Sequence, residues 1–345
     1  MTPGIGVGFV GAGPVVQSIH LPTLARLGEV FRIVALTDPD TAVATAVARR
    51  AQARAVDSLE ELLADPEVDV VAVCSPQDLH AEQVEAACRA GARAVLCEKP
   101  LAVSVSEAQR IAEVARATNT PILVGAMHTH DPGWTAVTDT RPDLLDQCRT
   151  VRSEIVLPPN ERFVGWATEL ASPPATGSAD TSDPDYRSAM IRAAVLGLTV
   201  HDLPLVRRFL GRLDEVDLSR FVAPFGYLLS IRGNGRTAEL LATMHGGWHT
   251  RWVLEAWGDT GSLRVDFTPS FVHAGSAVST VVLETGSERF GPFPRNGYEE
   301  QWLELARVCA GAPPRYDLDT VVADAAFTAE IAEAAAALVR TKVSS

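Results

Sequence analysis

One lysine occupies a position where it can take part in chemistry. The chain has 30 Lys and Arg residues, and only Lys99 and Lys342 are lysines. Lys342 stands near the end of the chain, whereas Lys99 follows a short apolar run within Glu98-Lys99-Pro100. A buried lysine donates hydrogen bonds and can change its protonation state, which arginine cannot do. Lys99 is therefore a candidate catalytic residue, and the competing interpretation is a surface lysine in a loop.

A glycine-rich turn near the start of the chain has the residue types that hold a phosphate. Read from Gly11, its pattern is Gly11-x-Gly13-x-x-Val16. Gly11 permits a tight turn, and Gly13 lets the backbone approach a pyrophosphate, which then sits at the N-terminus of a helix. Val16 replaces the third glycine of this pattern and should hold helix and strand slightly apart. The predicted cofactor-binding residues of this turn are Gly8, Gly11, Gly13, Pro14 and Val15.

An acidic residue, Asp38, ends the next apolar run. A carboxylate in this place accepts a hydrogen bond from the adenosine ribose and repels a 2′-phosphate. The sequence therefore favours NAD over NADP. The competing interpretation is that Asp38 caps the helix that follows it.

The elements that must position these residues alternate through the first third of the chain. Short, fully apolar runs indicate strands of a parallel sheet, and the Ala-rich segments between them have helical spacing. This alternation predicts a doubly wound α/β sheet, and Lys99 falls at its carboxyl edge, where ligands bind. The expected strands are 5–10, 32–36, 68–74, 94–96 and 122–124, and the expected helices are 15–27, 41–50, 59–63, 81–89 and 107–117.

The pattern changes after about residue 126. From residue 150 onward apolar and polar residues alternate, which is typical of antiparallel strands with one covered face. Asn234-Gly235 between two such runs predicts a hairpin turn. We expect a cofactor-binding domain, 1–126, and a substrate-binding α+β domain, 127–345. The last helices of the second domain could also pack on the first. The expected strands are 151–155, 227–232, 239–244, 252–257 and 279–283, and the expected helices are about 186–209, 299–309 and 321–339.

Composition excludes several classes of function. The 345-residue chain has a net charge of −13, which argues against general binding to nucleic acid or to an anionic membrane, since both need a basic partner. Its five cysteines include no C-x-x-C pair and indicate free thiols in a reducing compartment. No apolar stretch is long enough for a membrane span, and the first residues have the pattern of a strand and not of a signal peptide. We expect a cytoplasmic protein.

Several short motifs occur in an order that resembles the glucose–fructose oxidoreductase / inositol dehydrogenase / MocA family. Glu98-Lys99-Pro100, at its distance after the glycine turn, is fairly specific, and the combined order is more so. The matching residues extend over nearly the whole chain: Val7–Gly13, Gln17, His20-Leu21-Pro22, Ser75-Pro76, His80, Cys97–Leu101, His201-Asp202-Leu203, Trp257-Gly258, Gly261-Ser262-Leu263 and Asn296-Gly297-Tyr298.

The resemblance implies a Rossmann domain followed by an α+β domain with a large, open, mostly antiparallel sheet. It implies NAD(P) and the reversible oxidation of a secondary hydroxyl on a sugar, cyclitol or sugar nucleotide. It also implies homodimers or homotetramers that associate through the open faces of the sheets. In the family's pattern, Lys99 lies beside the nicotinamide and hydrogen-bonds the reacting oxygen. The further cofactor-binding residues that it implies are Ser75, Pro76, His80, Glu98, Lys99 and Pro100.

The chain departs from the family at one catalytic position. Many members have an aspartate four residues before a histidine that corresponds to His201, and here that position is Gly197. We expect His201 to act as general base and Lys99 to stabilise the developing alkoxide, with the reverse assignment open. The competing interpretations are a structural histidine, and a sensor or partner subunit that binds NAD(H) without turnover. A third is an enzyme that oxidises a sugar transiently to permit elimination or cleavage.

The remaining candidates concern the substrate. The predicted contacts are His128, Asp202, Trp248 and Tyr298, although aromatic rings can equally belong to the core. His128 and His130 alternate beside Asp131, so a strand would place both imidazoles on one face, but no further ligand is spaced to complete a metal site. The polar segment 172–185 is predicted to be a loop, either a surface insertion or a lid over the substrate.

Overall fold

A computed structural model gives the fold for residues 4–171, 181–244, 247 and 249–341. These residues form two units. The first comprises residues 4–125, 163–171 and 298–326, and the second comprises 126–162, 327–341 and the described residues from 181 to 297. Trp248 and most of the predicted loop, 172–180, lie outside the described residues, and the end of that segment begins a helix at Pro184.

Six parallel strands build the sheet of the first unit, in the order β3-β2-β1-β4-β5-β6. This is the order of a doubly wound nucleotide-binding sheet, and it confirms the fold class expected from the alternating pattern. The predicted strands are all present, and β3 is an addition because its two exposed residues form no apolar run. The strands are β1 (Ile5–Val10), β2 (Phe31–Thr37), β3 (Arg54–Ala55), β4 (Val70–Val73), β5 (Ala94–Cys97) and β6 (Ile122–Val124).

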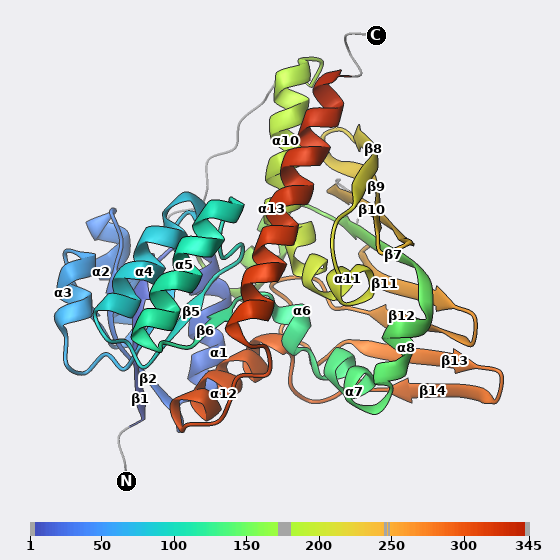
Figure 1. The fold of residues 1–345 in the computed structure, drawn as a ribbon. Helices are drawn as coiled ribbons and strands as arrows, with labels where there is room; N and C mark the ends of the chain where they lie inside the picture. Colours follow the sequence, from blue (N-terminus) through green and yellow to red (C-terminus); the bar gives the residue numbers. More distant parts are fainter. Residues whose placement is uncertain (1–3, 172–180, 245–246, 248, 342–345) are drawn as a thin grey trace. The chain divides into compact units, whose positions relative to one another are not determined.

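Helices cover both faces of this sheet. Neighbouring residues of a strand point to opposite faces, so Val71 belongs to one hydrophobic core, and Val70 and Ala72 belong to the other. The first core includes residues of α4 and α5, which lie side by side in Figure 1, and the second includes residues of α1, α2 and α12. The helices are α1 (Leu21–Arg26), α2 (Thr41–Ala51), α3 (Leu59–Ala64), α4 (His80–Arg89), α5 (Val105–Thr118), α12 (Gly297–Cys309) and α13 (Leu318–Thr341).

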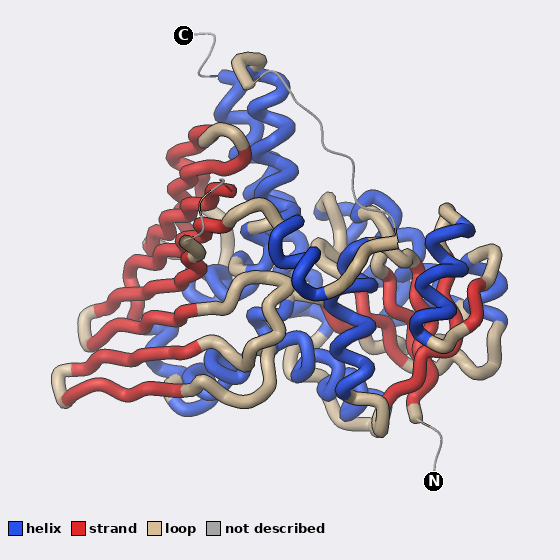
Figure 2. Tube along the Cα trace, turned by 180° about the vertical axis from the view of Figure 1, so that it is seen from behind, coloured by secondary structure: helices blue, strands red, loops and turns tan. Residues whose placement is uncertain are grey.

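Eight strands form the sheet of the second unit, in the order β14-β13-β12-β11-β7-β10-β9-β8. Its strands pair antiparallel except β7 with β10, which confirms the mostly antiparallel sheet. Buried Val151 and Ser153 alternate with exposed Arg152, so one face of β7 is covered, and Figure 2 shows the strands as one row. The strands are β7 (Cys148–Leu157), β8 (Glu215–Phe221), β9 (Phe225–Gly233), β10 (Arg236–Met244), β11 (Arg251–Gly258), β12 (Gly261–Asp266), β13 (Val278–Leu283) and β14 (Gly286–Phe290).

The hairpin predicted at Asn234-Gly235 joins β9 to β10. Both residues have positive φ angles, 50° and 73°, as a two-residue type I′ turn requires. The sequence did not predict β8, β12 and β14, because each has at most three apolar residues, too few for a clear alternation.

The single helix expected at about 186–209 is wrong. α10 (Pro184–Gly197) ends before a short 3₁₀ turn, Thr199–His201, and α11 (Leu203–Leu210) follows. Pro204 accounts for the break, because proline has no N–H and its ring clashes with a preceding carbonyl inside a helix. Among the described residues, no single helix is long and apolar enough to cross a bilayer, and this pair meets the criteria only when joined across a 79° bend. The other helices that begin in this unit are α6 (Met127–His130), α7 (Pro132–Thr140), α8 (Pro142–Gln147) and α9 (Glu161–Ala167).

Candidate functional site

The glycine turn between β1 and the first helix has room for a ligand at one glycine only. Gly11 has φ +96°, and a Cβ added to it would lie 2.7 Å from the carbonyl oxygen of Cys74. A Cβ added to Gly13 would meet nothing within 4 Å. Gly11 is therefore required by the turn itself, whereas Gly13 faces open space. The helix then begins with a π-helical turn, Val16–His20, which is wider than an α turn.

A pocket of about 590 Å³ opens beside this turn. It brings Gly11, Gly13 and Pro14 together with Asp38, and with Ser75 and Pro76 from the end of β4. Two aspartates and no lysine, arginine or histidine are among its lining residues in the described part of the chain. The lining residues are Val10, Gly11, Gly13, Pro14, Thr37, Asp38, Pro39, Asp57, Ser58, Leu59, Cys74, Ser75, Pro76, Leu79 and Gln83.

Asp38 anchors the turn through its carboxylate. Oδ2 accepts a hydrogen bond of 2.8 Å from the backbone N–H of Ala12, and Oδ1 accepts one of 3.0 Å from Asp40. The cap of α2 is Asp40, whose side chain accepts from the backbone N–H groups of Ala42 and Val43. Asp38 is thus not the helix cap, and its charge stands at the wall of the pocket.

Of the cofactor-binding residues predicted in the glycine turn, Gly8 and Val15 do not line this pocket, and His80, Glu98, Lys99 and Pro100 are also absent from its lining. A Cβ on Gly8 would lie 2.8 Å from Leu62 and 2.9 Å from Val68. Gly8 therefore gives β1 the space to pack against α3. Val15 precedes the π-helical turn and belongs to the helix start.

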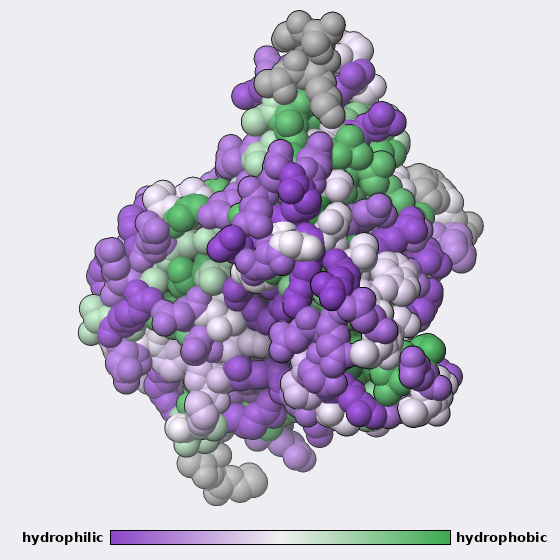
Figure 3. All heavy atoms as spheres, turned by 45° about the vertical axis from the view of Figure 1, so that its right-hand side comes forward, coloured by the Kyte–Doolittle hydropathy of each residue, from purple (hydrophilic) through white to green (hydrophobic). Residues whose placement is uncertain are grey.

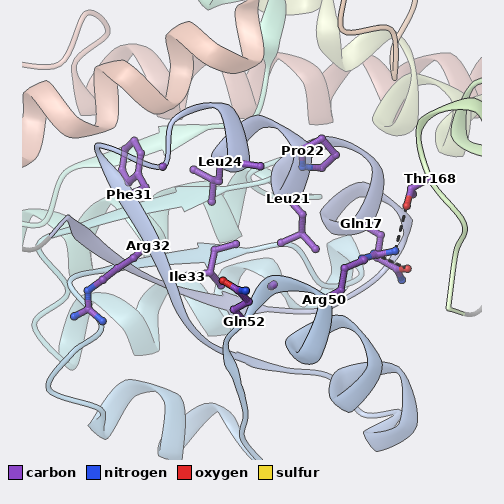
Figure 4. Close-up of a pocket in the computed structure, with 13 residues that line it drawn as sticks. Gln17, Leu21, Pro22, Leu24, Phe31, Arg32, Ile33, Arg50, Gln52 and Thr168 are labelled. Carbon is purple, nitrogen blue, oxygen red and sulfur yellow. Dashed lines mark hydrogen bonds between the residues drawn. The ribbon is translucent and has the colours of Figure 1, made fainter.

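A second pocket in the first unit, of about 510 Å³, contains none of the predicted site residues. Figure 4 shows its polar end, where Gln17, Arg50 and Thr168 point toward one another. Arg50 donates to Gln17 Oε1 at 3.1 Å and to Thr168 Oγ1 at 3.1 Å. Leu21, Leu24, Phe31 and Ile33 are among its apolar lining residues.

A buried chain of hydrogen bonds leads to Lys99. Trp302 Nε1 donates to His20 Nδ1 at 3.2 Å, so the proton of a neutral His20 ring is on Nε2. His20 Nε2 then donates to Glu98 Oε1 at 3.0 Å, and Glu98 Oε2 accepts from the backbone N–H of Lys99 at 3.1 Å. His20 and Trp302 are fully buried, and Glu98 is 7% exposed. This network fixes a carboxylate next to the partly buried lysine.

Burial and neighbouring charges have opposing effects on the pKa values of Lys99 and Glu98. Burial lowers the pKa of Lys99 below its ordinary value, and the Glu98 carboxylate opposes that change. Burial by itself raises the pKa of Glu98, but the hydrogen bond from His20 and the positive charge of Lys99 bring the pKa below its ordinary value. Glu98 is therefore an anion near neutral pH, and Lys99 loses its proton more readily than an exposed lysine.

His80 links the two loops that follow β4 and β5. Its Nδ1 lies 2.7 Å from the carbonyl oxygen of Pro100, and its Nε2 lies 2.9 Å from that of Ser75. Carbonyl oxygens only accept, so both bonds form together only in the imidazolium form. The Lys99–Pro100 peptide bond is cis. His80 thereby holds the Lys99-Pro100 loop against the Ser75 loop at the carboxyl edge of the sheet.

The second unit contains a separate buried polar cluster centred on Asp202, which is 0% exposed. Its Oδ2 accepts from Ser153 Oγ at 2.6 Å, and Trp252 Nε1 donates to both carboxylate oxygens at 3.0 and 2.9 Å. His128 Nδ1 lies 2.7 Å from Oδ1. Residues from β7, β11 and α6 therefore converge on one carboxylate.

Two imidazoles lie in this cluster. The ring centroids of His128 and His201 are 5.9 Å apart, and each ring makes an edge contact with Trp252. His128 also stacks on Phe267 with centroids 3.7 Å apart. His201 is 6% exposed and belongs to the 3₁₀ turn before α11. The arrangement offers a carboxylate-oriented base and a second imidazole beside it.

Comparison with known proteins identifies the nucleotide-binding part. Residues 5–126 match the GFO_IDH_MocA family, described as an oxidoreductase family with an NAD-binding Rossmann fold. Inositol 2-dehydrogenase 3 of Saccharopolyspora erythraea is 39% identical over 131 residues. Over residues 5–126 the chain is therefore similar to the Gfo/Idh/MocA oxidoreductases. The resemblance drawn from the motifs is confirmed.

Matches that extend into the second unit are more distant. The inositol dehydrogenase match spans 38% of this chain and 38% of that relative. A dTDP-3,4-didehydro-2,6-dideoxy-alpha-D-glucose 3-reductase of Streptomyces antibioticus is 27% identical over 282 residues, 79% of each chain. A 3-ketoreductase structure from Actinomadura kijaniata, in complex with NADP and TDP-benzene, has a TM-score of 0.70 and 22% identity, and the match covers 94% of this chain and 96% of that chain. The last match shows that the two chains share a fold.

Gly197, which stands where many family members have an aspartate, has open space around it. Gly197 is the exposed last residue of α10, and a Cβ added there meets nothing within 4 Å. No steric demand for glycine is evident. Because α10 ends at this residue, Gly197 and His201 are not one turn apart on a continuous helix, as the family pattern implies.

The predicted site residues fall into groups. The pocket unites six of them, and hydrogen bonds join Glu98 to Lys99 and His80 to Pro100. In the second unit His128, Asp202 and His201 come together, whereas Tyr298 is buried in the first unit and Trp248 is outside the described residues. The sequence did not predict the roles of His20, Trp302, Ser153 and Trp252.

His128 and His130 both lie in the short helix α6 and not in a strand. Asp131 caps α7 through Gly133 and accepts from the backbone N–H of Ala277 at 3.0 Å. Its carboxylate is therefore used by the backbone. Within the residues that the structure describes, no group of three or more His, Cys, Asp or Glu side chains is arranged to hold a metal ion.

Proposed function

We propose that the chain is a nicotinamide-dependent oxidoreductase that reversibly oxidises a secondary hydroxyl of a sugar or cyclitol. The observation that carries the proposal is Lys99. It is held beside an ionised Glu98 at the carboxyl edge of a Rossmann sheet, with a pKa below that of an ordinary lysine. A lysine in this state donates a hydrogen bond to an alcohol or ketone oxygen and stabilises a developing alkoxide.

The proposed cofactor is NAD. The space at Gly13 suits a pyrophosphate, and the nicotinamide, when bound, accepts or returns the hydride. Asp38 supplies a carboxylate for the ribose hydroxyls, and no cation among the lining residues of the described pocket is available to pair with a 2′-phosphate. Gly11, Gly13, Pro14, Asp38, Ser75 and Pro76 would hold the dinucleotide, and Glu98, Lys99, Pro100 and His80 would shape its nicotinamide side.

The proposed catalytic residues are Lys99 and His201, with His128 and Asp202 as further groups on the substrate side. Imidazoles and a buried carboxylate are suited to hydroxyl groups, which donate and accept hydrogen bonds. The names of the relatives support polyhydroxylated substrates, since they include an inositol dehydrogenase and a sugar-nucleotide reductase. A sugar or cyclitol is favoured, because the acidic chain shows no cationic cluster for a second phosphate in its sequence.

A second candidate function rests on Gly197. Without the family's carboxylate at this position, the chain could bind NAD(H) and a ligand as a sensor or partner subunit and catalyse no reaction. Lys99 and the buried imidazoles favour the enzyme. The two functions differ in one observable property, which is turnover at saturating cofactor.

We also propose that the chain forms a homodimer or homotetramer through the open face of its large sheet. Trp257 and Val282 are 42% and 49% exposed, and both are paired with Ser262, so they lie in one row across β11, β12 and β13. The neighbouring Arg264–Glu255 ion pair, at 2.8 Å, gives the same face charges. Figure 3 shows hydrophobic residues in separate groups on a largely hydrophilic surface. The free cysteines suit a reducing, cytoplasmic location.

The test begins with fluorescence titrations of the purified protein with NADH and NADPH. We expect NADH to bind more tightly, followed by turnover with at least one member of a panel of cyclitols, sugars and their keto forms. Tighter binding of NADPH would overturn the cofactor assignment. Binding without turnover on any member would favour the sensor, and binding of neither dinucleotide would refute the proposal.

A further inference from the structure

His128 is a buried histidine with one ring nitrogen left for a ligand. The residue is 2% exposed, and the hydrogen bond from Nδ1 to Asp202 fixes one edge of the ring. Within the described residues, the buried Nε2 atom has no hydrogen-bond partner. Buried polar atoms of side chains are nearly always paired, so this nitrogen marks a place where a donor is expected.

The hydrogen bonds around Asp202 define the tautomer of His128. Ser153 and Trp252 both donate to the carboxylate, and the indole N–H of Trp252 can only donate. The Asp202 carboxylate therefore accepts hydrogen bonds from both side chains, and it also lies 2.7 Å from His128 Nδ1. An ionised carboxylate can accept all three hydrogen bonds. The Nδ1 atom therefore carries the proton, and in the neutral ring the lone pair is on Nε2.

The position of Asp202 in the chain points to the same role. It immediately precedes α11, where an aspartate side chain normally accepts hydrogen bonds from the first N–H groups of the helix. Asp202 makes no such cap, and its carboxylate instead reaches Ser153 and His128. The Asp202 carboxylate thus orients the imidazole of His128 and does not cap α11.

We infer that His128, oriented by Asp202, is the general base that takes the proton of the substrate hydroxyl, an inference that rests on the proposed function. In the oxidation, a bound nicotinamide would accept the hydride of the carbinol carbon with both electrons of the C–H bond. The O–H bond breaks, its proton bonds to His128 Nε2, and the oxygen keeps that electron pair to form the C=O bond. The product of proton transfer is an imidazolium next to a carboxylate, so the charge is balanced within the pair. Ketone reduction follows the same steps in reverse.

His128 and Asp202 form a carboxylate–imidazole pair in a chain that has Gly197 in place of the family's aspartate. The pair comes from α6 and from the residue before α11, and not from positions 197 and 201. His201, with its ring centroid 5.9 Å from that of His128, contacts the substrate oxygen or a neighbouring hydroxyl. The proton of the substrate hydroxyl goes to His128, because the Nδ1 atom of this ring is hydrogen-bonded to Asp202.

The titratable groups around His128, besides Asp202, are His201, Asp131 and Tyr227. Asp131 is engaged by the backbone N–H groups of Gly133 and Ala277. Burial raises the pKa of Tyr227, and the charge of Asp202 raises it further, so this phenol stays neutral. The ring centroids of the two imidazoles are 5.9 Å apart, so a proton on one ring opposes a proton on the other. We therefore expect one acid limb in the pH profile of kcat/KM.

The test compares His128→Gln and Asp202→Asn with the parent and with His249→Gln. The last variant makes the same substitution at an exposed histidine of the same unit. For His128→Gln we expect a roughly 10²- to 10⁴-fold loss of kcat, the range of general-base catalysis, with NADH affinity within about threefold of the parent. For Asp202→Asn we expect a comparable loss, because the favoured tautomer then has its proton on Nε2 and the lone pair of the base is removed.

The pH profile separates a base from a structural residue. We expect the acid limb of kcat/KM to disappear in His128→Gln and to persist in His249→Gln. A His128→Gln variant that keeps kcat within about threefold, or that retains the acid limb, would overturn the assignment. Loss of the limb in His201→Gln alone would transfer the base to His201.

A measurement that does not depend on turnover covers the case of a variant that fails to fold. Nitrogen-15 spectra of the parent, labelled at its eight histidines, should assign to His128 a neutral ring protonated at Nδ1. A ring protonated at Nε2 would overturn the inference. A parent that binds NADH but acts on no polyol or keto sugar defeats the proposed function, and with it the base. A parent with turnover and an unaffected His128→Gln variant defeats the base alone.

Discussion

At Lys99, burial and a neighbouring carboxylate change the same pKa in opposite directions. Burial lowers the pKa, and Glu98 raises it. Glu98 itself stays ionised because His20 donates to it, and the orientation of His20 is fixed by Trp302. The side chain expected to touch the substrate thus depends on a tryptophan distant in the sequence.

We predict that Glu98→Gln moves the alkaline limb of the kcat profile to lower pH. Glu98 raises the pKa of Lys99, so removing its charge lowers that pKa further below the ordinary 10.5, and the protonated lysine is lost earlier as pH rises. The measurement is kcat against pH at saturating substrate. In the control Lys99→Arg the guanidinium stays protonated, so the limb due to residue 99 should vanish. An alkaline limb that is the same in all three proteins would contradict a role for this pair.

A second prediction at the residue scale concerns Asp38. Asp38→Asn removes the negative charge from the pocket wall, and the ratio of NADPH to NADH dissociation constants should fall by roughly tenfold, which is about 1.4 kcal/mol. Asp40→Asn is the matched control, because asparagine also caps helices and Asp40 is absent from the pocket lining. The two variants are compared by fluorescence titration. An equal effect in both would show that Asp38 does not select the cofactor.

The sequence predicted the individual residues better than their partners. Lys99 and the glycine turn were recognisable because their chemistry follows directly from short motifs. Trp302 and His20 are 282 residues apart and meet through packing of α12, which no local pattern describes. His128 was expected only as a substrate contact, since its link to Asp202 joins residues 74 positions apart.

At the scale of elements, β1 and its turn place the cofactor residues, and the break between α10 and α11 places His201 and Asp202. The first was predictable, because apolar strands and glycines have strong local patterns. The second was not, because helical spacing continues on both sides of the 3₁₀ turn, and Pro204 was read as part of one helix. Proline near a helix start and proline inside a helix look alike until the break is located.

The two glycines of the turn should respond differently to alanine. Gly11→Ala puts a Cβ 2.7 Å from the Cys74 carbonyl at φ +96°, so we predict a loss of stability of roughly 1 to 3 kcal/mol. Gly13→Ala meets nothing within 4 Å, so stability should change by less than about 1 kcal/mol. Gly13→Ala should nevertheless weaken NADH binding at least tenfold, since a methyl group occupies the pyrophosphate side. Denaturant unfolding and titration measure the two effects, and normal NADH binding by Gly13→Ala would contradict the predicted phosphate site.

At the scale of the whole molecule, the chain divides its tasks between two units. The Rossmann unit has the nucleotide pocket and Lys99, and the sheet unit has the His128–Asp202 pair and a broad open face. The division into a parallel and an antiparallel sheet was predictable from the change in hydrophobic period. The assignment of residues 163–171 to the first unit was not, because it depends on long-range packing.

For the open face, we predict that Trp257→Glu shifts the assembly toward the monomer. A charge in the apolar row of Trp257 and Val282 would be buried without a partner in a symmetric face-to-face dimer. Sedimentation measures the mass, and Thr45→Glu, on the solvent side of α2, provides a control that leaves the assembly unchanged. NADH affinity should be the same in each protein. A parent that is already monomeric, or a Trp257→Glu variant of unchanged mass, would exclude this face as the interface.

The central claim is that this chain transfers a hydride and uses Lys99 to do so. The most direct measurement is the nicotinamide absorbance after mixing the protein and NAD⁺ with a panel of cyclitols and sugars, for the parent and Lys99→Ala. We expect reduced nicotinamide with at least one polyol for the parent, and a loss of roughly 10²-fold or more in rate for Lys99→Ala with NADH binding retained. No reduction with any polyol, and no oxidation of NADH with any keto sugar, by a parent that binds NADH tightly would contradict it.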